Sequence, residues 1–151
     1  MSAAFATPDP AIDWLRAQIA AGQGGDVLLV GFRGDVPQGA WAAGLRGEQD
    51  HPNYVTFARF ALHKLHECHG YWLMLPAVFD DCLGYRLELR SRHAVWCGEV
   101  RMPEEADWTA QRGDDTPLLE DLLVPGAALP GIMRRELTVL ADRLAVEPPA
   151  V

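Results

Sequence analysis

The sequence predicts an α+β fold, in which an antiparallel sheet packs against helices from the N-terminus, the middle and the C-terminus of the chain. The first observation is a run of three strand patterns over residues 71–102, separated by short turns as in a β-meander. The second is the helical spacing of apolar residues before and after that run. With 151 residues, 49% of them hydrophobic, the chain suits a single domain, and we expect residues 1–8 and 147–151 to be disordered tails.

A first helix is predicted over residues 9–21, with Asp9 at the N-cap and Pro10 at the first helical position. Both faces of this helix are apolar. It is therefore either buried between other elements or in contact with a second subunit. One stripe holds Ile12, Leu15 and Ile19, and the opposite stripe, which supplies the candidate dimer contacts, holds Trp14, Ala17 and Ala21.

The middle of the chain predicts a buried strand, a loop and a second helix. Residues 27–32 are apolar throughout, as in a central strand. Residues 33–53 are rich in glycine and proline and predict a loop with one short strand near residues 40–45. Asn53 can cap a helix over residues 54–69.

The strands of the meander are predicted over residues 71–79, 85–90 and 94–102. The middle strand alternates polar and apolar residues, so its polar side chains should lie on the solvated face of the sheet. These polar residues are Arg86, Glu88 and Arg90.

Three further segments follow the meander. Residues 104–113 predict a polar linker, and Thr116 and Pro117 begin a short helix that ends at Leu123. Pro130 precedes the last helix. The residues of this helix that should face the core are Met133, Leu137, Leu140 and Leu144.

Composition and motifs exclude several classes of function. Ser2 and Ser91 are the only serines and Lys64 is the only lysine, so nucleophilic serines, Schiff-base lysines and phosphate-binding loops have almost no candidates. Three cysteines form no disulfide framework and indicate free thiols in a reducing cytosol. No apolar run is long enough to cross a membrane, and the net charge of −8 disfavours nucleic acid. We therefore expect a cytoplasmic protein that needs no cofactor.

Three histidines form the densest group of metal-capable side chains. His63 and His66 would lie on one face of the predicted helix, followed by His69. The zinc-protease spacing HExxH is missing, so another ligand would have to come from a distant residue such as Asp80 or His93. The histidines are therefore either solvated or the centre of a small metal-dependent hydrolase.

Residues 104–121 carry most of the negative charge. Seven carboxylates and one base, Arg112, give a net charge of −6 over eighteen residues. Such a cluster attracts basic partners, although acidic loops also serve as solvated connectors. Trp108 lies inside the cluster, either as a protein-binding hot spot or folded back onto the core. The candidate partner-binding residues are Glu104, Glu105, Asp107, Trp108, Asp114, Asp115, Glu120 and Asp121.

The order of the predicted elements is that of a known architecture. Helix, strands, helix, three strands and helix, with Leu118-Leu119-Glu120-Asp121-Leu122 before an amphipathic last helix, resembles the type III secretion chaperone-like family. Roadblock-type domains have nearly the same order, and the poorly formed second strand near Ala40 departs from both patterns. Either resemblance implies a homodimeric adaptor that binds other proteins without catalysis.

The sequence thus predicts a non-enzymatic, homodimeric interaction module of the cytosol, such as an adaptor, a chaperone-like protein or an inhibitor or immunity protein. Its partner would be another protein with a basic surface, bound through the acidic, tryptophan-containing segment. The alternative is the metal-dependent hydrolase centred on His63 and His66.

Overall fold

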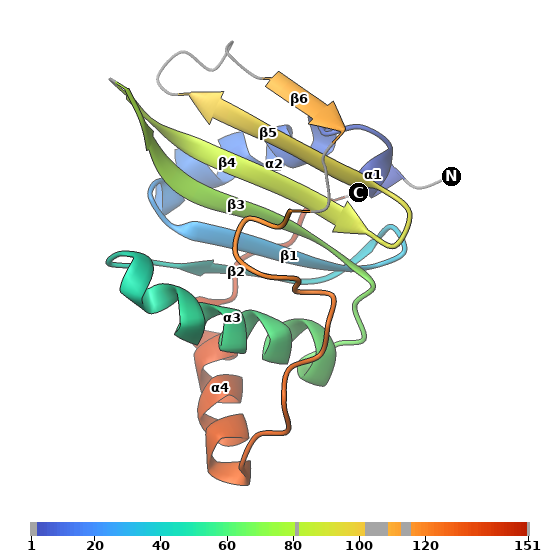
Figure 1. Ribbon diagram of the computed structural model, residues 1–151, viewed down its shortest axis with the longest axis vertical. Coiled ribbons are helices and arrows are strands. Elements are labelled where there is room, and N and C mark those ends of the chain that lie inside the picture. Colours follow the sequence, from blue (N-terminus) through green and yellow to red (C-terminus); the bar gives the residue numbers. More distant parts are fainter. Residues whose placement is uncertain (1–2, 81, 102–108, 113–115, 151) are drawn as a thin grey trace.

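The computed structural model describes residues 3–80, 82–101, 109–112 and 116–150 and shows an antiparallel sheet with helices on both faces (Figure 1). Its six strands lie in the order β2-β1-β3-β4-β5-β6. This confirms the predicted α+β class and the meander, which is β3-β4-β5. The strands are β1 (Val27–Arg33), β2 (Val36–Ala43), β3 (Gly70–Phe79), β4 (Cys82–Ser91), β5 (Val95–Arg101) and β6 (Thr109–Arg112).

Helices lie at the N-terminus, in the middle and at the C-terminus, as the sequence predicts. They are α1 (Ala3–Ala6), α2 (Asp9–Gln18), α3 (His51–Phe60) and α4 (Gly131–Leu144). A 3-10 turn, Glu48–Asp50, precedes α3, and α2 and α3 continue into π-helical turns, Ile19–Gln23 and Ala61–Leu65. Pro10 and Pro52 lie in the first turns of α2 and α3, where a missing backbone N–H leaves no bond unmade.

Each face of the sheet has its own apolar core. α1 and α2 cover one face, whose core includes Phe32 and Trp72. The other face, whose core includes Tyr71 and Leu73, is covered by α3, the inner side of α4 and residues 116–125, which we call the covering segment. Figure 1 shows this segment in orange, crossing in front of the sheet. Because β1 and β3 supply both cores, nearly every residue in them is apolar.

Residues 3–8 are ordered, whereas the sequence predicts that they belong to a disordered tail. Ala4 and Phe5 of α1 are buried in the core. The indole N–H groups of Trp72 and Trp96 donate to the backbone oxygens of these two residues at 3.0 and 2.9 Å. The prediction is wrong because it considers only the local sequence of this short segment. Its order comes from long-range hydrogen bonds with two tryptophans of the sheet.

Trp14 also belongs to the core and not to a free surface. Its side chain is 7% exposed, and its ring centroid lies 6.4 Å from that of Trp72. Its indole donates to the backbone oxygen of Glu147 at 3.3 Å, which orders the start of the predicted C-terminal tail. Ala17 and Ala21 are exposed. Of the three residues predicted to form a dimer contact, the largest, Trp14, is therefore buried within its own chain and is not accessible to a second copy.

The helix ends correct three predictions. Asp9 is already helical, and Pro8 occupies the N-cap of α2. Asn53 lies inside the first turn of α3 and is not its cap. The helical backbone after α3 ends before His66, which is extended with φ −135° and ψ 158°, so the predicted helix over residues 54–69 is too long.

Three other segments also differ from the prediction. β2 begins earlier than expected because Gly34, with a φ of +62°, makes the tight turn that leads directly from β1 into β2. β6 lies within the predicted linker and pairs with β5. The covering segment forms turns and bends in place of a helix over residues 116–123. There, the Asp121 carboxylate accepts the Leu123 N–H at 3.0 Å, a local bond that competes with helix formation.

Candidate functional site

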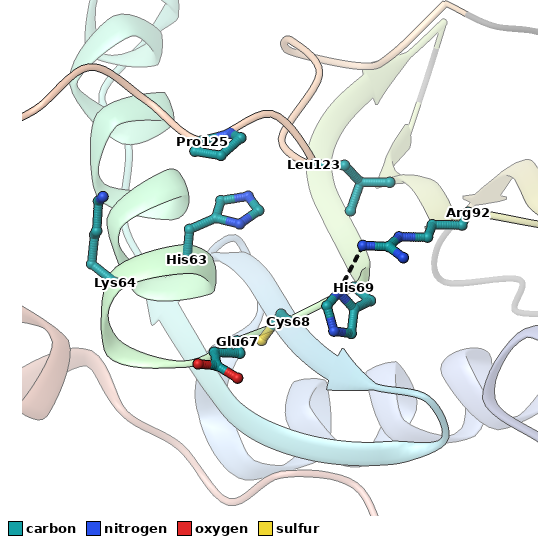
Figure 2. A pocket seen from close by; sticks show the side chains of 8 residues that line it. All are labelled: His63, Lys64, Glu67, Cys68, His69, Arg92, Leu123 and Pro125. Carbon is teal, nitrogen blue, oxygen red and sulfur yellow. Dashed lines mark hydrogen bonds between the residues drawn. The ribbon is translucent and has the colours of Figure 1, made fainter.

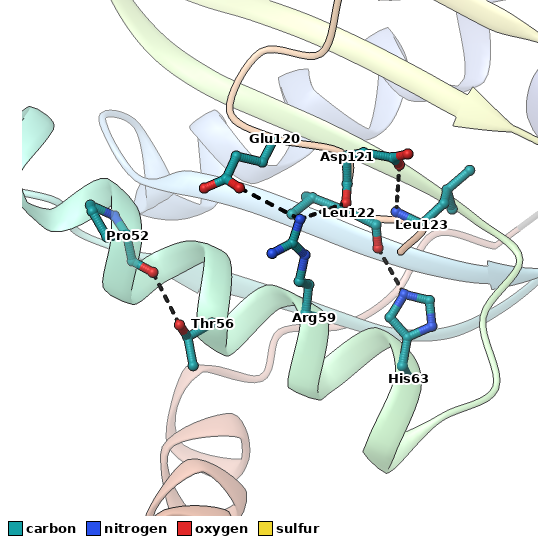
Figure 3. A network of polar contacts seen from close by, with 8 residues as sticks. All are labelled: Pro52, Thr56, Arg59, His63, Glu120, Asp121, Leu122 and Leu123. Carbon is teal, nitrogen blue, oxygen red and sulfur yellow. Dashed lines mark hydrogen bonds and ion pairs between the residues drawn. The ribbon is translucent and has the colours of Figure 1, made fainter. Parts of the chain in front are cut away.

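The predicted acidic binding surface is only partly described. Glu104, Glu105, Asp107, Trp108, Asp114 and Asp115 lie outside the described residues. The other two candidates, Glu120 and Asp121, belong to the covering segment and contact α3 (Figure 3). The Glu120 carboxylate lies 3.6 Å from the Arg59 guanidinium, which also donates to the backbone oxygen of Asp121 at 3.0 Å. Arg59 therefore compensates the charge of Glu120 within the chain.

Further contacts hold the covering segment in place. The Nε2 atom of His63 donates to the backbone oxygen of Leu122 at 2.8 Å (Figure 3). The Leu122 side chain is fully buried in the core of this face. α3 thus positions the segment through one arginine and one histidine, and the core anchors it through a leucine.

A buried ion pair joins β4 to the covering segment. Glu88 is fully buried, and its carboxylate accepts the Tyr71 hydroxyl at 2.7 Å. The Arg90 guanidinium donates to the same carboxylate at 3.0 and 3.1 Å, and the backbone of Leu118 adds a further hydrogen bond. The strand period predicts the correct face for Glu88 and Arg90. The predicted exposure is wrong because the covering segment closes that face, whereas the exposed side chain of Arg86 fits the prediction.

Burial and hydrogen bonding act in opposite directions on this pair. Burial raises the pKa of Glu88 above its ordinary value, although the bonds from Tyr71 and Arg90 lower it. The pKa of Tyr71 is also raised, first by burial and then by the neighbouring carboxylate. Because protein donors engage both oxygens of Glu88, we assign this group to holding the covering segment on the sheet.

The three histidines considered as metal ligands do not converge. His63 is bonded to the covering segment. The ring centroid of His66 lies 5.8 Å from that of Trp41, and Nδ1 of His69 accepts the Arg92 guanidinium at 3.3 Å. They diverge because the backbone leaves the helix at His66. Within the described ranges, no group of three His, Cys, Asp or Glu side chains is placed to hold a metal ion.

A cleft of about 420 Å³ opens where the π-helical turn after α3, the turn between β4 and β5, and the covering segment meet (Figure 2). We call it the polar cleft. Lys64 and Arg92 bring positive charge to it. The carboxylate of Glu67, which also lines the cleft, lies 3.6 Å from the guanidinium of Arg33, which is not a lining residue. The cleft is therefore basic although the protein is acidic. It is lined by His63, Lys64, Glu67, Cys68, His69, Arg92, Leu123 and Pro125.

Cys68 is buried in the wall of the polar cleft and lies close to β1. A Cβ atom on Gly31 would stand 2.6 Å from its sulfur, so the glycine allows this close approach. Burial raises the pKa of the Cys68 thiol to about 12, although Arg33 lowers it. The thiol is therefore protonated at neutral pH and is not an activated nucleophile.

A second cleft, of about 470 Å³, adjoins the polar cleft, and His69 and Arg92 line both. We call it the apolar cleft, because its other walls are mainly carbon. The remaining lining residues are Phe5, Ala6, Gly34, Gly70, Ser91, His93 and Ala94. The sequence does not reveal this site, because its residues come from four separate segments and none of these segments carries a motif.

α4 carries a surface of a different kind. Figure 1 shows it at one end of the long axis, with α3 between it and most of the sheet. Its inner side packs on the core, as predicted, through Leu137, Leu140 and Leu144. Met133 is 39% exposed and corrects that prediction, because the first turns of α4 extend beyond the core.

The outer side of α4 is partly apolar. Ile132 and Val139 are 61% and 57% exposed. They line a shallow groove together with Arg135, Glu136 and Arg143, and Leu140 borders this groove from the edge of the core. We call this set the outer face of α4.

In the described part of the chain, no helix has both the length and the apolar character that a bilayer-spanning helix requires. Comparison with known proteins found no matching family model, no matching curated protein and no matching solved structure.

Proposed function

We propose that this protein is a non-enzymatic protein-interaction module of the cytosol, and that it works as a homodimer paired through the outer face of α4. The observation that carries the proposal is the exposure of Ile132 and Val139 on a helix whose opposite side is already packed on the core. A helix that is apolar on two sides is typical of one that is buried on two sides. The sequence predicts a dimer through α2, and the structure favours α4 in its place.

The charges on the outer face of α4 favour a second copy of the same chain as its occupant. In a two-fold symmetric contact, residue i meets residue j and residue j meets residue i. If two α4 helices pack antiparallel with Ile132 opposite Val139 of the second copy, Arg135 lies opposite Glu136 of the second copy. The same register therefore joins two apolar pairs and two opposite-charge pairs, and α4 is complementary to itself.

Charge reversal tests this register. Arg135→Glu or Glu136→Arg alone places like charges opposite each other twice in the dimer, and each should raise the dissociation constant about tenfold. The combined swap, R135E with E136R, restores both pairs and should recover the affinity of the wild type. Sedimentation velocity over a range of concentrations measures all four proteins.

Two outcomes would overturn the α4 dimer. One is a wild-type protein that stays monomeric at every concentration. The other is a swap variant that is no stronger than the single reversals, because the charges would then not face each other. The matched control is Val78→Glu with Leu83→Glu at the tip of the β3–β4 hairpin, where the two side chains are 77% and 68% exposed. This control should dimerise as the wild type does.

The sequence supports a basic protein as the further partner of this module. Because Arg59 compensates Glu120, we propose that the partner-binding charge comes from residues 104–115, above all from Asp114 and Asp115. Asp114→Lys with Asp115→Lys should release basic proteins that the wild type retains from a native lysate at low salt. Glu48→Lys is the control. It reverses the charge of an exposed residue that is distant in the sequence from the acidic segment, and it should retain the basic proteins. Equal retention by both variants would contradict the acidic site.

A further inference from the structure

We infer that the polar and apolar clefts together form a binding site for a small amphiphilic anion, a molecule with a carboxylate or phosphate head and an apolar body. The inference rests on one juxtaposition. His69 and Arg92 form a shared wall, with basic side chains on one side and a mainly carbon-lined hollow on the other. This site is separate from the dimer contact proposed on α4.

The polar cleft offers charge and directed donors to an anionic head. Lys64 and Arg92 are exposed, so their side chains can adjust to a ligand. Arg92 donates to Nδ1 of His69, so the proton of that ring is on Nε2, which is left to donate to a ligand. Figure 2 shows these side chains on three separate elements around the cleft. Charge-assisted hydrogen bonds of this kind are the strongest that a neutral-pH site offers to a carboxylate or phosphate.

His63 lines the polar cleft while it holds the covering segment. Its Nε2 donates to the backbone oxygen of Leu122, a group that can only accept.

The apolar cleft suits the body of such a ligand. Its walls include Phe5, Ala6 and Ala94, and the glycines at positions 34 and 70 add no side chains. At about 470 Å³ it has the size of a pocket for a small organic molecule. Cys68, in the wall of the polar cleft, has a protonated thiol and is therefore a poor nucleophile. The site thus binds its ligand without a covalent step.

Calorimetric titration with four probes tests the inference on the full chain. Decanoate and decyl phosphate combine a head with a body, decanol has the body alone, and inorganic phosphate has the head alone. We expect at least one of the two amphiphilic anions to bind one per chain, about tenfold or more tightly than decanol and inorganic phosphate. The stronger of the two identifies the head group.

Substitutions separate the two ends of the site. Arg92→Gln should weaken the amphiphile about tenfold without changing decanol, and Arg92→Lys should recover part of the affinity. Ala6→Phe, at an exposed position of α1, should fill the apolar cleft and abolish binding of the amphiphile. Arg46→Gln removes an exposed arginine outside both clefts and should bind as the wild type does. Circular dichroism confirms that each variant is folded.

The inference is overturned if neither amphiphile binds, if decanol binds as tightly as the anions, or if Arg46→Gln weakens binding as much as Arg92→Gln. The R135E single variant, which tests the dimer, should bind the amphiphile as the wild type does. Failure of the dimer and failure of the cleft are therefore distinguishable.

Discussion

Two buried tyrosines on the same face of the sheet differ in their hydroxyl groups. Tyr71 donates to the Glu88 carboxylate at 2.7 Å, whereas the Tyr54 hydroxyl has no partner among the described residues. Both residues belong to one core. The same substitution at the two positions should therefore have different effects on stability.

We expect Tyr71→Phe to lower the free energy of unfolding by about 2 kcal/mol, because a buried carboxylate loses a donor. Tyr54→Phe should leave it unchanged or raise it by about 1 kcal/mol, because a buried hydroxyl without a partner disappears. Urea denaturation measures both. Equal losses would contradict the hydrogen-bond assignment, since the volume change is the same in the two variants.

The pH dependence of stability reports on Glu88. Its pKa is raised in the folded protein above the ordinary value of 4.5, so the folded state holds this proton more tightly than the unfolded chain does. The resulting stability is fully present below pH 4.5 and is lost as pH rises through the folded pKa.

Tyr71→Phe should make this loss larger, because the Tyr71 hydroxyl lowers the pKa of Glu88 and its removal raises that pKa further. Urea denaturation between about pH 4 and pH 8 measures the difference between wild type and variant. The difference should grow as pH rises. A difference that stays constant across the range would show that Glu88 does not titrate as described.

At the scale of single residues, the sequence predicts the side of the strand on which a side chain lies better than it predicts whether that side chain is exposed. The alternation in β4 correctly places Glu88 and Arg90 on one side of the strand. It cannot show that a segment about thirty residues later covers that side, because this contact is long-range. Exposure of a polar residue is therefore a weaker prediction than its direction.

At the scale of elements, the covering segment takes part in more of the features described above than any other loop. It closes the Glu88 ion pair, forms one wall of the polar cleft and leads to α4. Its attachment depends on one fully buried leucine, Leu122, and on contacts with Arg59 and His63.

We expect Leu122→Ala to lower the free energy of unfolding by about 3 kcal/mol, because it leaves a cavity under the segment. Leu83→Ala, at a position 68% exposed, is the matched control and should cost less than about 0.5 kcal/mol. Hydrogen exchange should also show faster exchange of the Leu123 N–H in the Leu122 variant. A variant as stable as the wild type would mean that the leucine does not anchor the segment.

The elements themselves were predictable where one local pattern decided them. The strands of the meander and α4 follow directly from period and from Pro130. The covering segment and the end of α3 were not, because tertiary contacts override the helical pattern there. β6 has no pattern of its own and exists because β5 offers it an edge.

At the scale of the whole molecule, charge is distributed unevenly. The net charge is −8, yet the polar cleft is basic, and much of the negative charge lies in residues 104–121. The composition gives the total charge correctly, but it cannot show where the basic cleft lies. The cleft forms only when the turn after α3 meets the turn between β4 and β5, so no sequence window contains it.

The tryptophans that the sequence assigns to partner binding also have a different place in the fold. Four tryptophans lie in described segments, where three are buried and Trp96 is half-buried, so they mainly serve the core and not a partner. The homodimer stays a proposal, and the contact proposed for it is now the outer face of α4, whose exposed stripe lies beside the core stripe of the same helix. Both stripes are visible in the sequence, but only the fold shows which of them is covered.

The most direct measurement of the α4 dimer is disulfide formation between two variants that each add one cysteine to the three of the chain, Ile132→Cys and Val139→Cys, mixed in equal amounts under mild oxidation. We expect peptide mass spectrometry to find the bond between positions 132 and 139 in the mixture. Neither variant alone should form a bond between identical positions, because these lie about 10 Å apart along the antiparallel helices, too far for a disulfide. No 132–139 bond in the mixture, or equal cross-linking of each variant with itself, would contradict the dimer.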